Sequence, residues 1–384
     1  MSIRRALTLS RRPAAAFVVV GIFWGVFAGF VPVLKAGIGA SDAVFGLVLL
    51  GSATGLVSSM FLAPLADRVL GPRGMQAGAA LLSAAWLLPA LMPGPLSFAV
   101  AMAGVGLGSG LLDVVMNARV SELEARHRLP LMNANHAMFS LAYAVGALVA
   151  GAAREAGIGP APVFAALALV CTLLLLPMLR MAPDITAEEA GAAPARLPVL
   201  AVALCGAVVL IAFFSEATVE SWSALHIERT LGGGAAAGVF GPAMLGLTMC
   251  LGRFSGQALA ERLPTLPLIA GAALVSASGT ALAALAPTPG VAILGFAVLG
   301  IGVSVIGPLG LAEVGGRVPP AARTRAISRV AVTGFSGFFF APIVMGLVSE
   351  AFGLRWAFGL VAMALCLLPL LAWRLSRLPR KARA

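Results

Sequence analysis

The sequence predicts an all-α integral membrane protein in which twelve transmembrane helices form two six-helix bundles. Three observations predict this class: apolar runs of membrane-spanning length, a two-sided distribution of Lys and Arg, and an internal repeat at about half of the chain. Of the 384 residues, 60% are hydrophobic and 11% are charged, and the mean hydropathy is +1.02. A water-soluble chain of this length needs more polar surface, so we expect lipid to be its solvent.

Twelve apolar segments are each close to the ~20 residues that cross a ~30 Å hydrocarbon layer as a helix. They are residues 14–34, 44–64, 74–92, 96–118, 131–153, 160–180, 197–222, 235–257, 264–286, 290–312, 326–347 and 354–373. The first segment follows an Arg-rich start but lacks a small-residue cleavage site, so we interpret it as an uncleaved helix and not as a signal peptide.

The Lys and Arg residues predict the orientation of these segments. Twenty-two of the 26 lie at the termini or in every second gap, among them Arg119, Arg253 and Arg317. The alternate gaps hold Lys35, Arg154, Arg229 and Arg355. Because positive charge is retained on the cytoplasmic side, we expect both termini to be cytoplasmic in a bacterial-type inner (plasma) membrane.

Composition also indicates the partners. The net charge of +11 is spread through short loops without aromatic interleaving, so we expect anionic membrane lipids and no nucleic acid as partners. Four cysteines, Cys171, Cys205, Cys250 and Cys366, sit singly in apolar segments and indicate packing. No nucleophile, base and orienting residue group together, so we expect no enzymatic activity, no cofactor and no metal, and we expect a monomer.

An internal repeat divides the chain. Ala66-Asp67-Arg68 returns as Ala260-Glu261-Arg262, and Gly106 and Gly108 return as Gly300 and Gly302. We therefore predict an N-terminal bundle (1–180), a cytoplasmic linker (181–196) and a C-terminal bundle (197–384) in the same orientation. Parallel halves of this kind place a binding site near the midplane where they meet.

A loop motif carries a first resemblance. The run after the second segment is Leu65-Ala66-Asp67-Arg68-Val69-Leu70-Gly71-Pro72-Arg73, and it resembles the loop signature of the major facilitator superfamily. The resemblance implies a cytoplasmic latch, or gate, formed by Asp67, Arg68 and Arg73, which steadies the outward-open state. Acid and basic groups at a helix end can pair in this way. A solvated turn that only holds topology is the alternative.

A second resemblance lies in the fourth segment. Asp113 precedes Asn117 by four residues, and this spacing is similar to the fucose–proton symporter group and its uncharacterised relatives. The resemblance implies that Asp113 carries the coupling proton. That group also has an acid in its first segment, whereas residues 14–34 contain none, so the resemblance does not extend to fucose as the substrate.

Asp113 lies about a turn and a half before the end of its predicted segment, with Asn117 on the same face. A carboxylate there costs ~2.5 to 3.5 kcal/mol unless it faces protein or a wet cavity. It either exchanges protons as its surroundings change or makes an interhelical hydrogen bond that only fixes packing. For His136, at a similar predicted depth, three roles are open: it shares a proton with Asp113, it binds a substrate hydroxyl, or it is a core histidine.

Four further side chains are candidates. Glu216 lies one turn before Glu220, and we predict substrate binding or a second proton site for Glu216 but interfacial water around Glu220. Trp222 either anchors at the interface or stacks on substrate. Trp24 either lines the cavity or packs in the core, and Glu313 either gates the inner end or pairs with Arg317.

These features predict a secondary active transporter that works by alternating access. We expect proton symport of a small polar metabolite, sugar-like or an organic acid, because buried carboxylates and amides offer polar contacts. The fifth segment also lacks the proline that drug–proton antiporters usually carry there. Proton-coupled efflux of an amphipathic compound is the alternative, followed by a lipid-moving or sensor protein without coupled transport.

Overall fold

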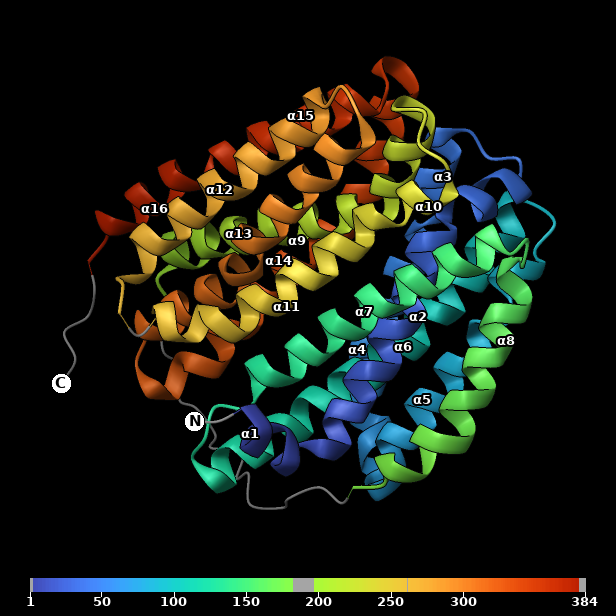
Figure 1. Cartoon of the computed structure of the whole chain (residues 1–384). Helices are drawn as coiled ribbons and strands as arrows, with labels where there is room; N and C mark the ends of the chain where they lie inside the picture. Colours follow the sequence, from blue (N-terminus) through green and yellow to red (C-terminus); the bar gives the residue numbers. More distant parts are fainter. Residues whose placement is uncertain (1–2, 182–196, 261, 380–384) are drawn as a thin grey trace.

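The computed structural model describes residues 3–181, 197–260 and 262–379. Within these ranges, eleven helices are long and apolar enough to cross a membrane, and a shorter apolar helix covers Pro160–Leu173. The helices form two groups, α1–α8 and α9–α16, that lie side by side (Figure 1). The predicted fold class is confirmed. The predicted linker, residues 181–196, lies outside the described residues except for Met181.

The first half consists of eight α-helices and four short helical turns. They are α1 (Ile3–Leu9), α2 (Arg11–Gly37), α3 (Asp42–Val48), α4 (Leu50–Leu70), η1 (Gly71–Arg73), α5 (Gly74–Ala85), η2 (Pro89–Leu91), α6 (Pro95–His127), α7 (Met132–Glu155), α8 (Pro160–Val170), η3 (Cys171–Leu175) and η4 (Leu176–Leu179). Two of these helices, α6 and α8, begin with proline, which lacks the N–H that a first helical turn leaves unpaired.

The second half has the same order of long helices. They are α9 (Val199–Leu225), η5 (His226–Thr230), α10 (Ala235–Gly238), α11 (Phe240–Ala260), α12 (Thr265–Leu285), α13 (Pro289–Gly316), α14 (Pro320–Phe352), α15 (Leu354–Cys366) and α16 (Leu368–Ser376). Again two helices, α13 and α14, begin with proline.

Two predicted segments differ from the structure. Residues 160–180 were expected as one helix, but α8 ends at Val170 and continues as a π turn and a 3-10 turn that contains Pro177. Proline removes a backbone donor and crowds the preceding turn, which accounts for the break. The fourth segment was expected to end at residue 118, but α6 runs on to His127 and ends at Arg128 in the left-handed region.

The repeat is visible in the packing. Helix α2 packs along α7, as α9 packs along α14. Gly106 of α6 lies against the backbone of Ser52 in α4, and its repeat partner Gly300 of α13 lies against Thr248 and Leu245 in α11. Small residues let helices approach closely in a membrane, where interhelical packing replaces the hydrophobic effect.

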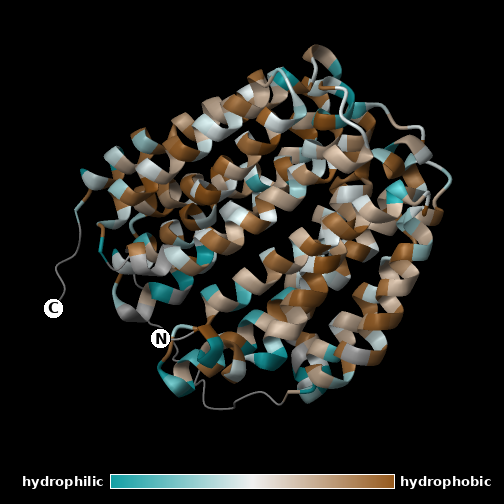
Figure 2. Ribbon diagram, in the orientation of Figure 1, coloured by the Kyte–Doolittle hydropathy of each residue, from teal (hydrophilic) through white to brown (hydrophobic). Residues whose placement is uncertain are grey.

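The surface of the helices is apolar. Four large apolar side chains are each more than 70% exposed: Phe61, Leu96, Val199 and Leu285. Exposure of such side chains to water would be unfavourable. Figure 2 shows hydrophobic residues along the helices and hydrophilic residues gathered toward the two ends of the molecule. This pattern fits a chain surrounded by lipid along its length.

The two ends of the bundle differ. We use the name termini end for the end that carries α1, Met181 and the last turn of α16, and the name loop end for the opposite end, with residues 38–41 and 231–234. The two halves meet at the loop end, and their ribbons diverge toward the termini end (Figure 1).

Helix packing inside the first half is directly testable at two glycines of α2. A Cβ added at Gly25 would overlap the backbone carbonyl of Tyr143 in α7, whereas a Cβ at Gly37 would meet nothing within 4 Å. Overpacking costs about 1 to 3 kcal/mol, so we expect Gly25→Ala to lower the apparent melting temperature in detergent by several degrees. Gly37→Ala is the control and should melt like the parent; equal melting of both variants would contradict the packing.

Candidate functional site

A cavity of about 190 Å³ lies between the two halves. Its walls come from α2, α4, α6 and α7 of the first half and from α9 and α14 of the second half. The lining residues are Val20, Trp24, Phe27, Leu49, Ser52, Ala53, Leu56, Gly106, Ser109, Asp113, Phe139, Glu216, Ala217, Glu220, Ser221, Phe335, Phe338 and Pro342. Because both halves contribute, a movement of one half against the other changes access to this space.

Asp113 is the carboxylate that the first half presents to the cavity. Asn117, one turn further along α6, donates from Nδ2 to the Asp113 carboxylate at 3.1 Å and to the Asp113 backbone carbonyl at 2.8 Å. Asn117 is not among the cavity-lining residues, so it holds Asp113 from behind. Since α6 continues to His127, Asp113 lies fourteen residues before the helix end, or about 21 Å at 1.5 Å per residue, whereas the predicted segment ends at residue 118.

Trp24 also lies in the cavity wall. Its indole N–H donates to the hydroxyl of Ser109 in α6 at 3.1 Å. The ring stands edge-to-face with Phe27 at 5.5 Å between centroids and with Trp86 at 5.2 Å. These contacts hold the Trp24 ring in one orientation and leave part of its surface toward the cavity.

The second half presents Glu216 and Glu220 from adjacent turns of α9. Glu216 pairs with Arg253 of α11 at 3.4 Å between Oε1 and a guanidinium nitrogen. The other terminal nitrogen of Arg253 donates to the Ser140 hydroxyl and, at 3.2 Å, to the His136 carbonyl, both in α7. Arg253 therefore connects the cavity-lining helix α9 of one half to α7 of the other.

Two of these placements correct the sequence interpretation. Arg253 was assigned to a cytoplasmic loop, but it lies within α11 and its side chain is 12% exposed. Its position inside the predicted segment 235–257 was the signal that could have revealed this. Glu220 was expected in interfacial water, but it lines the cavity because α9 continues to Leu225 and so places this turn within the bundle.

His136 and Trp222 do not line the cavity. The ring of His136 packs edge-to-face on Phe17 at 4.8 Å, and its described contacts do not include Asp113. Trp222 is fully buried and lies edge-to-face with Phe45 of α3 at 5.7 Å. Direct contact of either ring with a molecule in the cavity therefore has no support from their placement.

A polar network joins the two halves at the loop end. Asp42, the first residue of α3, is 6% exposed and accepts hydrogen bonds from both terminal nitrogens of Arg229, each at 2.6 Å. Lys35 lies 2.9 Å from the same carboxylate, and Ser349 of α14 donates to it at 2.5 Å. The carboxylate of Glu350 in turn accepts the backbone N–H of Asp42 at 2.8 Å.

A second bidentate pair lies beside this one. Arg154 at the end of α7 donates to both oxygens of Glu228 in η5, at 2.7 and 2.8 Å, and to the backbone carbonyl of Gly29 at 2.9 Å. We call the seven residues Lys35, Asp42, Arg154, Glu228, Arg229, Ser349 and Glu350 the loop-end network. Its three cations and three carboxylates balance in charge, and bidentate Arg–carboxylate pairs are the strongest of such contacts.

The backbone approaches closely at the same end. A Cβ at Gly46 of α3 would overlap the carbonyl of Pro342 in α14, and Gly346 lies against the backbone of Asp42. Glycine at these positions lets α3 and α14 touch. The loop-end network and this contact together close the loop end.

The predicted gating residues lie at the termini end. Arg68 and Arg73 are exposed, and the side chain of Asp67 lies outside the described part of the structure, so the predicted latch stays a prediction. Glu313 is buried and accepts from Arg317 of the same helix at 2.8 Å, which is the pairing alternative. Arg317 also donates to the backbone carbonyl of Leu375 at 2.8 Å, so this pair ties α13 to α16 within the second half.

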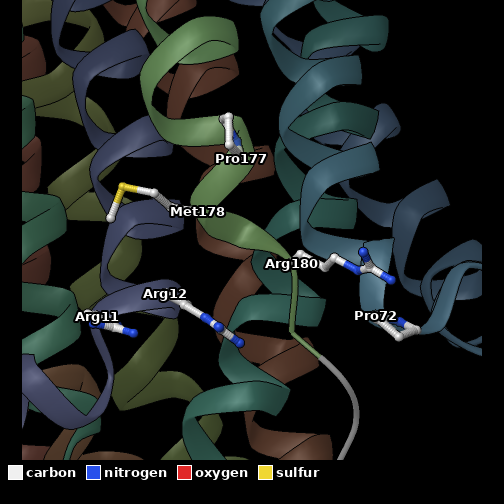
Figure 3. A pocket seen from close by; sticks show the side chains of 6 residues that line it. All are labelled: Arg11, Arg12, Pro72, Pro177, Met178 and Arg180. Atoms are coloured by element: carbon white, nitrogen blue, oxygen red, sulfur yellow. The ribbon is translucent and has the colours of Figure 1, made fainter.

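A larger hollow of about 700 Å³ at the termini end belongs to the first half alone. Its lining residues are Arg11, Arg12, Pro72, Pro177, Met178 and Arg180 (Figure 3). No residue of the second half is among them, so relative movement of the halves would not open and close it. The three arginines belong to the cations that the sequence assigns to the headgroup region.

This geometry defines a class of protein: a two-bundle membrane carrier that is closed at one end and has, between its halves, a largely apolar cavity with three carboxylates in its wall. The chain belongs to the Major Facilitator Superfamily, whose family model matches residues 14–309 and 243–384. It is therefore a multi-pass membrane transporter with a small-molecule substrate, and not an enzyme.

Comparisons with known proteins agree with this membership. The chain is 28% identical over 358 residues to an uncharacterised MFS-type transporter of Yersinia pestis, covering 91% of each. Its fold is similar to that of a bacterial homologue of the human lysosomal transporter Spinster in an inward-facing and occupied conformation, with TM-score 0.79, 16% identity and full coverage of both chains. It is also similar to a D-xylose–proton symporter, with TM-score 0.76, 18% identity and 99% coverage of both chains.

The loop-end network makes a conformational prediction. Asp42→Asn removes the charge that Lys35 and Arg229 share. Arg229 is 44% exposed, so solvent screens its pair with Asp42 and limits the effect of the variant. We expect the conformational equilibrium to shift by roughly tenfold toward the state that is open at the loop end. Spin labels at Ala36 and Ala351 should then report a longer distance by pulsed electron paramagnetic resonance. The control Glu155→Gln changes an exposed acid at the same end and should leave the distance distribution unchanged. An unchanged distribution in Asp42→Asn would remove the network from the conformational equilibrium.

Proposed function

We propose that the protein is a secondary active transporter that moves a small molecule across the membrane by alternating access, coupled to protons. The observation that carries this proposal is the cavity shared by the halves, with carboxylates on both walls and one closed end. Substrate binds in the cavity, and the two halves rock so that the cavity is exposed to one side at a time. Such rocking about a fixed midplane site is the general scheme of transporters built from repeated halves.

The orientation follows from the distribution of cations. The four cations of the alternate gaps, Lys35, Arg154, Arg229 and Arg355, all lie at the loop end, and the Arg-rich termini lie at the other. We propose that the termini end is cytoplasmic, which makes this state closed to the outside. The fold similarity to an inward-facing homologue of Spinster supports that assignment.

Asp113 and Glu216 are the proposed proton sites. A carboxyl group that moves between a wet and a dry environment gains and loses protons as its surroundings alternate, because burial disfavours its charged form. Asp113 faces the cavity directly, and Asn117 bonds its carboxylate. In the proposed cycle Asp113 is protonated from outside, substrate binds beside Trp24 and Glu216, the halves switch, and both leave inward.

We also retain the kinship with the fucose–proton symporter group as a proposal, resting on the Asp113 and Asn117 spacing. Similarity in fold to a proton symporter for a sugar supports coupling to protons. His136 and Trp222 are then positioning residues, since one lies beside Arg253 and the other supports α9 against α3.

The second candidate is proton-coupled efflux of an amphipathic compound. The aromatic lining of the cavity by Phe139, Phe335 and Phe338 favours it. Right-side-out vesicles with an inward proton gradient separate the two: a symporter accumulates a labelled ligand, and an exporter does not.

Asp113→Asn tests the coupling. With a labelled ligand found by a thermal-shift screen, we expect the variant to lose at least about tenfold in gradient-driven accumulation while it still exchanges ligand without a gradient, because a neutral amide cannot carry the proton. Glu155→Gln is the control and should transport like the parent. Uptake by Asp113→Asn that keeps its full dependence on pH would remove Asp113 from the mechanism.

A further inference from the structure

The charges that line the central cavity do not balance. Asp113, Glu216 and Glu220 all reach it, and the described residues that line it include no Lys, Arg or His. From this imbalance we infer that the cargo is a small organic cation, a protonated amine with an apolar or hydroxylated body. This inference rests on the proposed function and names the substrate class of the same cavity.

One of the three carboxylates is compensated within the protein. Arg253 lies behind the cavity wall and pairs with Glu216 at 3.4 Å. Neither Asp113 nor Glu220 has an ion-pair partner among the residues that the structure describes, and the one hydrogen-bond donor to the Asp113 carboxylate there is the neutral amide of Asn117. When cargo displaces water from this space, both groups need a proton or a cation, because an unpaired charge away from water is costly.

The remaining polar groups in the wall, among the residues that the structure describes, are the neutral side chains of Trp24, Ser52, Ser109 and Ser221. The Trp24 N–H is bonded to Ser109, and the Ser52 hydroxyl donates to the Leu49 carbonyl at 2.8 Å. Arg253 uses its second terminal nitrogen on α7. A carboxylate cargo would meet like charge with only neutral hydroxyl groups to hold it, so the organic-acid part of the expected substrate range is disfavoured by this geometry.

The apolar part of the wall fits a cation too. Trp24, Phe27 and Phe139 of the first half face Phe335 and Phe338 of the second half across the cavity. Aromatic faces attract ammonium groups through their ring quadrupole, most strongly where water is excluded. The volume of about 190 Å³ is below the ~300 to 1,000 Å³ of drug-sized ligand pockets, which indicates a small amine in this state.

A cationic cargo also explains how protons and cargo can be coupled. Of the two carboxylates without an ion pair, Asp113 takes the proton and Glu220 takes the ammonium group, so both carboxylates are neutralised before the halves switch. Glu216, which pairs with Arg253, lies one turn from Glu220 and orients the cargo.

The test uses the full-length protein in lipid nanodiscs and two sets of matched probes that differ only in charge. One set is glucosamine, glucose and glucuronate; the other is phenethylamine, 2-phenylethanol and phenylacetate. Calorimetric titration should give at least one amine a Kd about tenfold or more below that of its neutral partner, with no binding of the acids. Equal or tighter binding of a neutral or acidic probe, or no binding of either amine, would overturn the inference.

A variant assigns the effect to the cavity. Glu220→Gln keeps the side-chain shape and should weaken amine binding about tenfold while it leaves any binding of the neutral probe unchanged. Glu155→Gln, which alters an exposed acid, should change neither. Loss of binding of all probes alike in Glu220→Gln would indicate structural damage and would contradict a charge-specific role.

Vesicle uptake of the tightest probe separates the two proposals. If a neutral or acidic probe is accumulated under a proton gradient, the transporter proposal stands and the cation inference fails. If an amine binds with the expected selectivity but is neither accumulated nor exchanged, the binding site stands and the transport proposal fails.

Discussion

Charge in a low-dielectric setting is the constraint on which the structure depends. Lipid offers no water to a charged side chain, so a charge within a span must face protein or an aqueous space. The chain meets this requirement in three different ways: paired at the loop end, paired through Arg253 behind the cavity, and unpaired in the cavity itself. The position of each charge therefore indicates whether it closes the protein, connects its halves or meets the cargo.

The charges of the loop-end network balance, whereas those of the cavity do not. At the loop end, three cations and three carboxylates from both halves satisfy one another, so this end is stable when closed. In the cavity, two of the three carboxylates form no ion pair with the described residues. A carrier needs both arrangements. The end that closes without cargo must pair its own charged side chains, whereas the binding site must keep charged side chains unpaired so that the cargo can pair with them.

Arg253 connects the cavity to the contact between the two halves. It touches Glu216 on the cargo side and Ser140 and the His136 carbonyl on the opposite half. A cargo that changes the charge around Glu216 also changes how strongly Arg253 holds α7. This is a direct physical link between occupancy of the cavity and the contact between halves.

The apolar segments predicted the fold well, because membrane-spanning helices follow from length and composition alone. The sequence also selected Asp113, Glu216 and Trp24, which the structure brings to one cavity. It missed the inward position of Arg253 and Glu220 and the pairing of Asp42 with Arg229, since these depend on which helices meet across the two halves. A charged residue within an apolar span shows that its side chain needs a polar or charged partner. Which residue is that partner depends on which helices pack together in the tertiary fold.

Accessibility of the cavity from each side of the membrane tests the central claim most directly. A single cysteine at Ser221, in a background without the four native cysteines, would be treated in proteoliposomes with a membrane-impermeant thiol reagent from either side. The account predicts labelling from the termini side alone in the parent and a gain of labelling from the loop side when Asp42 is changed to Asn. Labelling from both sides in the parent, or from neither side in both proteins, would contradict a cavity that opens to one side at a time.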